Sequence, residues 1–348
     1  MKIALLNTKP TLRANYLLES FAKGLEQFGD RPIWVMEHNN FRDKVKEADV
    51  AVQVCAPNRH HSNSIPGLFR IEVNAALEAA GKRVLTIDTG FLKCQSDMEL
   101  EAGAANRKHE VLFDLDNKDT YEAVLKDVYY SVGFEGLKRN ADYCNTGSPP
   151  DRWKKLGIPI KPWRKRGNHI LLIGQTLHGL SSQHIDIYEW YGRVVKQIRT
   201  MTRKLIVFRH HPRLVKIRGP ENKSRIDKDN NAIKKAVKDF RNFRSSTGWT
   251  LEEDLHDAWC AVAFTSNAAV PTVVSGIPLF SGDPACMAWP VSGHSLHRID
   301  RPPTPKREQW ANDLAYAQWT VAEFMSGECW KHFRSHALKP RSSGRALQ

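Results

Sequence analysis

A short run rich in histidine and arginine is the stretch of the chain best equipped for chemistry: Arg209-His210-His211-Pro212-Arg213. It follows residues 204–208, an apolar stretch that predicts a buried strand. Proline would end the strand and stiffen the loop, holding the neighbouring side chains in place. His211 and Arg213 could then donate hydrogen bonds and positive charge to phosphate groups. A metal site is the poorer interpretation because adjacent histidines diverge, and a basic loop without function is the alternative.

Two more polar segments follow predicted strands in the same half of the chain. They are Gly174, Gln175 and Thr176 after residues 169–173, and Thr265, Ser266 and Asn267 after residues 260–264. A glycine lets backbone amides approach a phosphate closely. Ser266 or Asn267 would cap a helix whose first amides stay open to an anion. An ordinary tight turn and a plain capped helix are the alternatives. If the strands belong to one parallel sheet, the three loops would surround one diphosphate.

In the first half of the chain, Asp88 follows the predicted strand 83–87. A carboxylate there could take the proton of an acceptor hydroxyl as a general base. Local hydrogen bonding is the competing explanation, because aspartate commonly bonds to nearby backbone. His60 and His61, in the loop after the predicted strand 49–54, are further candidates for contacts with an acceptor.

Alternating strand and helix patterns would position these residues. In the first half we predict strands at 2–6, 32–36, 49–54, 83–87 and near 110–114, and helices at 11–28, 68–80 and 119–130. In the second half we predict strands at 169–173, 204–208, 260–264 and 277–280, and helices at 183–201, 232–243, 250–258 and from 266. The alternation predicts an α/β fold with two Rossmann-like domains facing each other across a cleft. The expected divisions are 1–137, a basic linker or ordered excursion at 138–167, 168–304, a terminal helix at 305–328 and a basic tail at 329–348.

The formal net charge of +14 is concentrated in two segments. Residues 138–166 contain nine basic and two acidic residues, and residues 203–244 contain fourteen basic and four acidic residues. Such concentration indicates a surface that binds a polyanion, with a solvated basic face as the alternative. The candidate contacts are Lys138, Arg139, Arg152, Lys154, Lys155, Lys234, Lys235 and Lys238.

Several classes of protein are disfavoured by what the sequence lacks. The six cysteines are scattered without a Cys-x-x-Cys pair, which argues against a disulfide or zinc framework and favours a reducing cytoplasm. The opening MKIALLN is too short for a signal peptide, and no apolar run is long enough to span a bilayer. A P-loop lysine motif, Gly-x-Ser-x-Gly and His-Glu-x-x-His are all missing.

The second-half motifs together resemble the donor-binding domain of GT-B glycosyltransferases. The likeness covers about residues 168–285 and includes His211-Pro212, Thr265-Ser266-Asn267 and the turn Gly276-Ile277-Pro278. It is closest to a branch with a His-Pro motif, which includes bacterial sialyl- and capsule-sugar transferases. The resemblance implies that His211 and Ser266 contact the phosphates of the donor. The family's doubled serine is Ser266-Asn267 here, and we find no clear acidic-Asp-Gly acceptor motif.

A second resemblance, over about residues 129–175, is to phage-encoded glycosyltransferases associated with hypermodified DNA. We therefore predict a cytoplasmic transferase that uses a nucleotide-sugar, with a UDP-sugar as first choice and no bound metal. Gln175, His211, Arg213 and Ser266 would hold the diphosphate. The preferred acceptor is a hydroxymethylated pyrimidine in double-stranded DNA. The alternatives are a transferase building surface polysaccharide at an anionic membrane, and a non-enzymatic DNA- or nucleotide-binding regulator.

Overall fold

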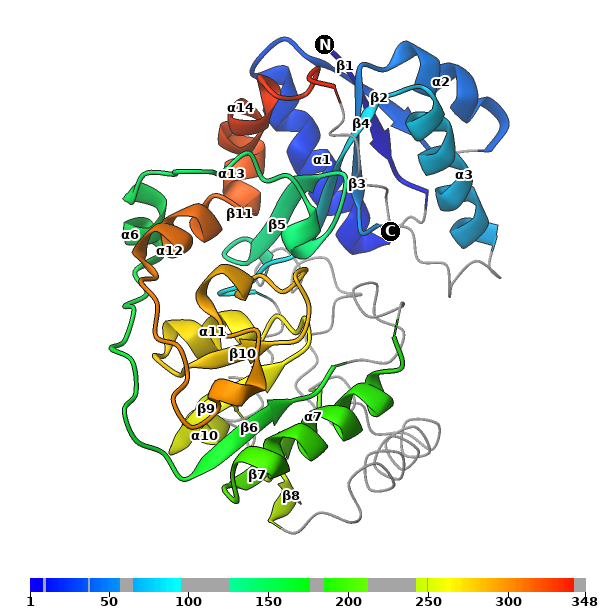
Figure 1. The fold of residues 1–348 in the computed structure, drawn as a ribbon. Coiled ribbons are helices and arrows are strands. Elements are labelled where there is room, and N and C mark those ends of the chain that lie inside the picture. Colours follow the sequence, from blue (N-terminus) through cyan, green and yellow to red (C-terminus); the bar gives the residue numbers. More distant parts are fainter. Residues whose placement is uncertain are drawn as a thin grey trace. The chain divides into compact units, whose positions relative to one another are not determined.

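The computed structural model describes residues 1–8, 11–36, 38–56, 65–94, 125–175, 185–211, 242–248 and 250–340 (Figure 1). The chain forms two compact units, each with its own sheet. The first comprises Met1–Gln95, Leu112–Arg152 and Asn312–Gln348, and the second comprises Ser96–Val111 and Trp153–Ala311. The chain thus leaves the first unit, builds most of the second, and returns to the first near its C-terminus.

The sheet of the first unit is mostly parallel, as the sequence pattern predicts. Its strands are β1 (Lys2–Leu6), β2 (Arg31–Val35), β3 (Val50–Val54), β4 (Arg83–Thr89), β5 (Tyr129–Phe134) and β11 (Gln318–Thr320), in the order β11-β5-β4-β3-β1-β2. At one edge β5 runs antiparallel to β4, and β11 pairs antiparallel with β5. The helix predicted over 119–130 is therefore wrong at its end, because Tyr130 pairs with Thr89 of β4. Residues 110–114, where we predict a strand, lie outside the described residues.

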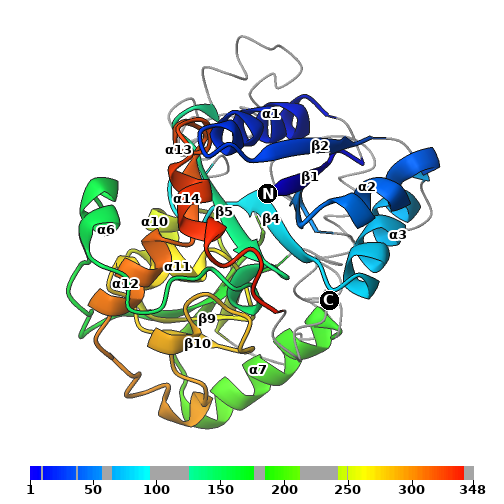
Figure 2. The same ribbon diagram turned by 90° about the horizontal axis from the view of Figure 1, so that it is seen from above.

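Helices cover this sheet. α1 (Leu12–Glu26), α2 (Phe41–Glu47) and α3 (Ile65–Ala79) confirm the helices predicted at 11–28 and 68–80 and add a short one. α2 and α3 lie side by side (Figure 2). Their buried residues, among them Phe41, Phe69 and Val73, pack on Ala4 and Leu6 of β1. Side chains alternate along a strand, so Ala4 and Leu6, two residues apart, point to the same face of the sheet.

The C-terminal part of the chain does not form the single helix predicted over 305–328. It divides into α12 (Glu308–Ala315), β11, α13 (Val321–Met325) and α14 (Glu328–Arg334). Thr320 starts α13 with a capping box to Glu323, and Gly327, with a φ of 77°, separates α13 from α14. α14 buries Trp330 and Phe333, so the segment predicted as a basic tail begins as a packed helix. Residues 341–348 lie outside the described part of the chain.

The sheet of the second unit is entirely parallel. Its strands are β6 (His169–Ile173), β7 (Leu205–Arg209), β8 (Phe243–Ser245), β9 (Ala258–Ala263) and β10 (Leu279–Ser281), in the order β10-β9-β6-β7-β8. α7 (Ile187–Met201), α10 (Leu251–Leu255) and α11 (Ala269–Val274) match three predicted helices. β8 was not predicted, and most of the helix predicted over 232–243 lies outside the described residues.

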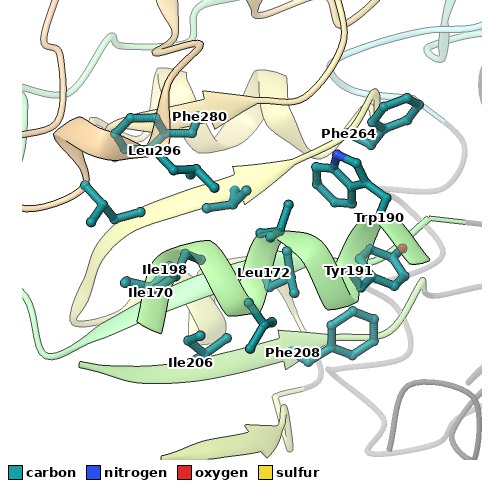
Figure 3. Close-up of a cluster of buried hydrophobic side chains, with 14 of the residues drawn as sticks. Ile170, Leu172, Trp190, Tyr191, Ile198, Ile206, Phe208, Phe264, Phe280 and Leu296 are labelled. Carbon is teal, nitrogen blue, oxygen red and sulfur yellow. The ribbon is translucent and has the colours of Figure 1, made fainter. Parts of the chain in front are cut away.

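The core of the second unit lies between α7 and the central strands (Figure 3). Leu172 of β6 and Phe208 of β7 are buried against Trp190 and Tyr191 of α7. Tyr191 meets Phe208 edge to face, with ring centroids 5.1 Å apart. This packing fixes α7 over the carboxyl ends of β6 and β7, where the predicted phosphate loops begin.

Residues 138–167 form an ordered excursion that both units share. The segment contains a 3-10 turn (Lys138–Asn140) and α6 (Asp151–Leu156). Beyond α6 it follows the second unit, since Arg164 N donates to Gly276 O at 2.7 Å and Trp163 Nε1 donates to Pro305 O at 2.9 Å. In the described part of the chain, no helix has the length and apolar character needed to cross a membrane.

Candidate functional site

The candidate site lies at the carboxyl edge of the second sheet, where the strand order reverses direction. The chain runs from β6 to β7 and β8 on one side, whereas β9 and β10 lie on the other. In open parallel sheets, ligands bind beyond the strand ends at such a switch point. Ile173 pairs with Arg209 of β7 and with Ala263 of β9. Gln175, which is two residues beyond Ile173, therefore leaves the sheet level with His211 and Thr265.

Gln175 and Thr265 join the two strands that flank the switch point. Gln175 Nε2 donates to Thr265 Oγ1 at 2.7 Å, and Thr265 N donates to Gln175 Oε1 at 3.1 Å. Gln175 N also donates to the hydroxyl of Tyr191 at 2.7 Å. Both residues are buried. The sequence predicts that Gln175 holds phosphate; in the structure its amide oxygen and nitrogen both bond to Thr265, so it also positions the neighbouring loop.

Gly174 is where the loops after β6 and β7 come closest. Gly174 N donates to Arg209 O at 2.7 Å. A Cβ at this position would lie 2.6 Å from that oxygen and 3.2 Å from the backbone nitrogen of His211. Glycine is thus required here by the close approach of two backbone segments, whereas the sequence alone predicts that it allows the approach of a phosphate. Thr176 lies outside the described residues.

Arg209, the first residue of the basic run, points into the protein. It is 6% exposed and forms an ion pair with Asp254, which also accepts from the hydroxyl of Ser246. Arg209 Nη1 further donates to the carbonyl of Thr250 at 3.0 Å. The charge of Arg209 is therefore compensated inside the second unit, so Arg209 supports the sheet edge whereas His211 and Arg213 are the predicted phosphate contacts.

The two histidines that follow Arg209 are only partly buried. The ring of His210 stands edge-on to Phe208, with centroids 4.8 Å apart, so this residue extends the aromatic cluster under α7. His211 is next to the Gly174 loop and remains the candidate for contact with phosphate. Pro212 and Arg213 lie outside the described residues.

The turn after β9 differs from the predicted capped helix. The N-cap of α11 is Ala268, which makes no side-chain capping bond, in place of Ser266 or Asn267. Ala269 N donates to Ser266 O, Val270 N donates to Asn267 O, and Ala268 N donates to Ser266 Oγ at 3.4 Å. The first amides of α11 are thus engaged within the turn, and not open to an anion. Ser266 Oγ accepts in this turn, and a hydroxyl that accepts can still donate its own proton.

Asp88, the predicted general base, belongs to the first unit and lies near the end of β4. Its Oδ1 accepts a long hydrogen bond of 3.8 Å from Cys55 Sγ. Burial raises the pKa of Cys55 to about 11, and the nearby charge of Asp88 adds to this. The thiol is therefore protonated at neutral pH and acts as the donor. His60 and His61 lie outside the described residues.

The basic residues proposed for a polyanion surface divide into two groups. Arg152 forms a two-pronged ion pair with Glu323, at 2.9 and 3.1 Å, and its guanidinium lies 3.7 Å above the ring of Trp319. It supports the C-terminal elements of the first unit, and this corrects its assignment to a nucleic-acid contact. The exposed residues of the set are Arg139, Lys154 and Lys155, with Lys138 partly buried. Lys234, Lys235 and Lys238 lie outside the described residues. Within the described residues, no cluster of three or more potential metal ligands occurs.

No protein-family profile and no curated protein matches the sequence. Two solved structures share its fold across nearly the whole chain. The β-Kdo 2,7-transferase of KpsC from Thermosulfurimonas dismutans has a TM-score of 0.50 and 11% identity, over 95% of this chain and 99% of that one. The β-Kdo 2,4-transferase of the same KpsC has a TM-score of 0.52 and 10% identity, over 93% and 98%. The chain therefore has a GT-B-like fold with two Rossmann-like units.

Proposed function

We propose that the chain is a glycosyltransferase that moves a sugar from a nucleotide-sugar to a hydroxyl group. The observation that carries this proposal is the hydrogen-bonded pair of Gln175 and Thr265, which ties β6 to β9 at the switch point of the second sheet. The fold shared with two sugar transferases supports the same class of reaction.

His211 and Ser266 are the proposed contacts to the diphosphate of the donor. As the bond between the anomeric carbon and the diphosphate oxygen breaks, the electron pair stays on the leaving diphosphate. Hydrogen-bond donors already in place stabilise that charge without having to reorganise. Gly174, Gln175 and Thr265 position the two loops, and Thr176, Arg213 and Asn267 are further proposed contacts. A UDP-sugar is the first donor to test.

Asp88 is the proposed base. The acceptor oxygen forms the new bond to the anomeric carbon, and its proton passes to the Asp88 carboxylate. Such proton transfer contributes about 10²- to 10⁴-fold to the rate of an enzyme. A regulator with the same fold would bind the donor without releasing nucleoside diphosphate. The variant Asp88→Asn separates the two cases, because it should abolish turnover and leave donor binding intact.

The acceptor is proposed to be a saccharide. The fold likeness to two Kdo transferases favours it over DNA, and so does the use of basic residues inside the protein. Arg152 and Arg209 are ion-paired, Arg164 Nη1 donates to the carbonyl of Leu255, and Lys204 Nζ donates to that of Gly167. DNA remains the competing acceptor because Arg139, Lys154 and Lys155 are exposed.

One assay compares the two acceptors. Radiolabelled nucleotide-sugars are offered with a panel of capsule-type oligosaccharides or with hydroxymethylated duplex DNA. Transfer to a saccharide is expected. Transfer to DNA, accompanied by binding that weakens steeply with salt, would instead identify the acceptor predicted from the sequence. A chain that neither binds UDP, CMP or GDP nor transfers any sugar would refute the proposed function.

Replacement of His211 tests the donor site. His211→Ala removes one donor to the leaving diphosphate, and kcat should fall about 100-fold. The matched control is His256→Ala, since His256 has 81% of its side chain exposed on the same unit. Steady-state transfer rates with saturating donor give the comparison. Equal kcat values for the two variants would show that His211 has no part in the reaction.

A further inference from the structure

A second polar cluster lies at the carboxyl edge of the first sheet. Leu6 of β1 pairs with Gln53 of β3, and Val54 of β3 pairs with Ile87 of β4. Thr8, Cys55 and Asp88 therefore leave the three parallel strands at one level. Three neighbouring strand ends carry polar side chains where the fold places ligands.

A buried ladder of amides fixes α3 above these strands. Asn74 Nδ2 donates to Gln53 Oε1 at 3.0 Å, and Gln53 Nε2 donates to Thr86 Oγ1 at 3.2 Å. All three residues are at most 4% exposed. Arg70 precedes Asn74 by one helical turn, so the ladder also determines where Arg70 lies. Arg70 Nε donates to Thr8 Oγ1 at 3.2 Å, which holds the guanidinium over the strand ends.

The charge of Arg70 is not compensated by the residues that the structure describes. Arg70 is partly buried and forms no ion pair with them, and burial lowers the pKa of its guanidinium. Arg13, in the first turn of α1, adds a second positive charge near Cys55. The Cys55 thiol is neutral at physiological pH, since burial raises its pKa to about 11, and therefore does not balance the charge of Arg70. A partly desolvated, unpaired guanidinium is unfavourable unless an anion binds it.

Two further unusual features lie at the same edge, one in the backbone and one in a buried side chain. Cys55 has a φ of 63°, a left-handed conformation that non-glycine residues rarely adopt. Asn7 is 3% exposed, and its Oδ1 has no hydrogen-bond partner within the described residues. Strained backbone and unsatisfied buried acceptors persist mainly where a ligand or a reaction requires them.

We propose that Arg70, supported by Arg13, binds an oxyanion of the acceptor, either a carboxylate or a phosphate, beside Asp88. The identification of the ligand as the acceptor rests on the proposed function, whereas the anion site itself does not. Arg70 is suited to this task because its two Nη groups can donate in parallel to two oxygens while Nε is anchored on Thr8. The acceptor would thus be an acidic molecule, held by its charge with a hydroxyl close to the base.

Calorimetric titration of the full chain tests this site. The probes are inorganic phosphate and glucuronate, each added with excess UDP so that the donor loops are occupied. Binding of at least one probe is expected, and the arm that binds identifies the chemistry of the anion. Arg70→Gln should weaken that binding about tenfold or more. Arg70→Lys, which keeps the charge and loses the parallel donors, should give a smaller loss.

The matched control is Arg31→Gln, because Arg31 is exposed at the opposite end of the same sheet. It should bind the probe as the unmodified protein does. Failure of the unmodified protein to bind either anion would overturn the proposal, as would equal affinities in all the variants. If Arg70→Gln does not fold, the comparison between Arg70→Lys and Arg31→Gln decides in the same way. A protein that binds the anion but no nucleotide would refute the proposed function and leave the anion site standing.

Discussion

A single amide side chain determines the geometry of the donor loops. Gln175 satisfies a buried backbone N–H and a buried hydroxyl of Thr265 at the same time. A buried donor without a partner costs about 1 to 3 kcal/mol, which is a large share of the stability of one domain. The bond therefore fixes the loops after β6 and β9 relative to each other and does more than fill space.

Gln175→Leu tests this role. The replacement leaves Thr265 N buried without an acceptor, and the free energy of unfolding should fall by about 1 to 3 kcal/mol. The affinity for UDP should fall as well, because the loops after β6 and β9 are no longer held beside each other. Gln197→Leu, at an exposed position of α7, is the control and should change neither quantity. Urea titration and calorimetry measure the two effects, and unaltered UDP affinity in a folded Gln175→Leu variant would contradict this role.

The strand ends of the second sheet could be located from the sequence, but the roles of the residues that follow them could not all be predicted. Glycine and polar residues after apolar runs mark strand ends, so the residues near Gly174, His211 and Thr265 were placed correctly. The role of Arg209 was not predictable, because its partner Asp254 is 45 residues away. In the sequence, Asp254 looks like one more acid on an exposed helix. A local pattern does not show whether a charged side chain turns toward solvent or toward the interior.

At the scale of elements, α14 is held to the first unit by one buried carboxylate. Asp30 accepts from Trp330 Nε1 at 2.7 Å, from Arg334 Nε at 2.8 Å and from the N-terminal ammonium at 2.5 Å. Burial alone would raise the pKa of Asp30, but these three donors together lower it to about 2. The carboxylate of Asp30, just before β2, thus joins the N-terminal ammonium to α14.

Acid should weaken this coupling. The pKa of Asp30 is lower in the folded chain than its ordinary value of 3.8, so its contribution to stability is complete above pH 4 and is lost as the pH falls toward 2. The contribution is about 2 kcal/mol. Asp30→Asn should reduce the free energy of unfolding at pH 7 and flatten its dependence on pH between 4 and 2. Glu26→Gln, at an exposed position of α1, serves as the control. Identical pH profiles for the two variants would contradict the assignment.

The missed strands include β8 and β11, which are short, and the six-residue β5, whose start lies within the helix predicted over 119–130. β1, β3, β6, β7 and β9 were predicted because each is an apolar run long enough to show a pattern. β11 has only three residues and exists because it pairs with β5, nearly 190 positions earlier. The capping box at Thr320 and the positive φ of Gly327 then divide what reads as one amphipathic helix. Tertiary pairing, in such cases, overrides local preference.

At the scale of the whole molecule, the two units differ in how the chain encloses them. All five strands of the second sheet lie between Trp153 and Ala311, whereas the first sheet needs β11 from the C-terminal segment. α13 and α14 also pack against α1, where Phe21 meets Phe324 with ring centroids 5.7 Å apart. The two units should therefore respond differently when they are expressed separately.

A fragment of residues 153–311 should fold and melt cooperatively, because it contains all five strands of the second sheet and the helices packed on them. A fragment of residues 1–152 should not, since it lacks the strand beside β5 and the helices on α1. Joining residues 312–348 to the fragment of residues 1–152 through a flexible linker should restore the melting transition of that fragment. Circular dichroism during heating measures all three, and cooperative melting of residues 1–152 alone would contradict the expectation.

The contact between Asp30 and Trp330 joins residues 300 positions apart. During synthesis, the N-terminal strands leave the ribosome first, but Asp30 and α1 must wait for almost the entire chain before α13 and α14 appear. The second unit can complete its own contacts earlier, so the order of folding reverses the order of synthesis. Contacts of such long sequence separation are slow to form and leave apolar strands exposed meanwhile. Refolding yield and dependence on chaperones should consequently be governed by the first unit, even though the proposed donor site belongs to the second.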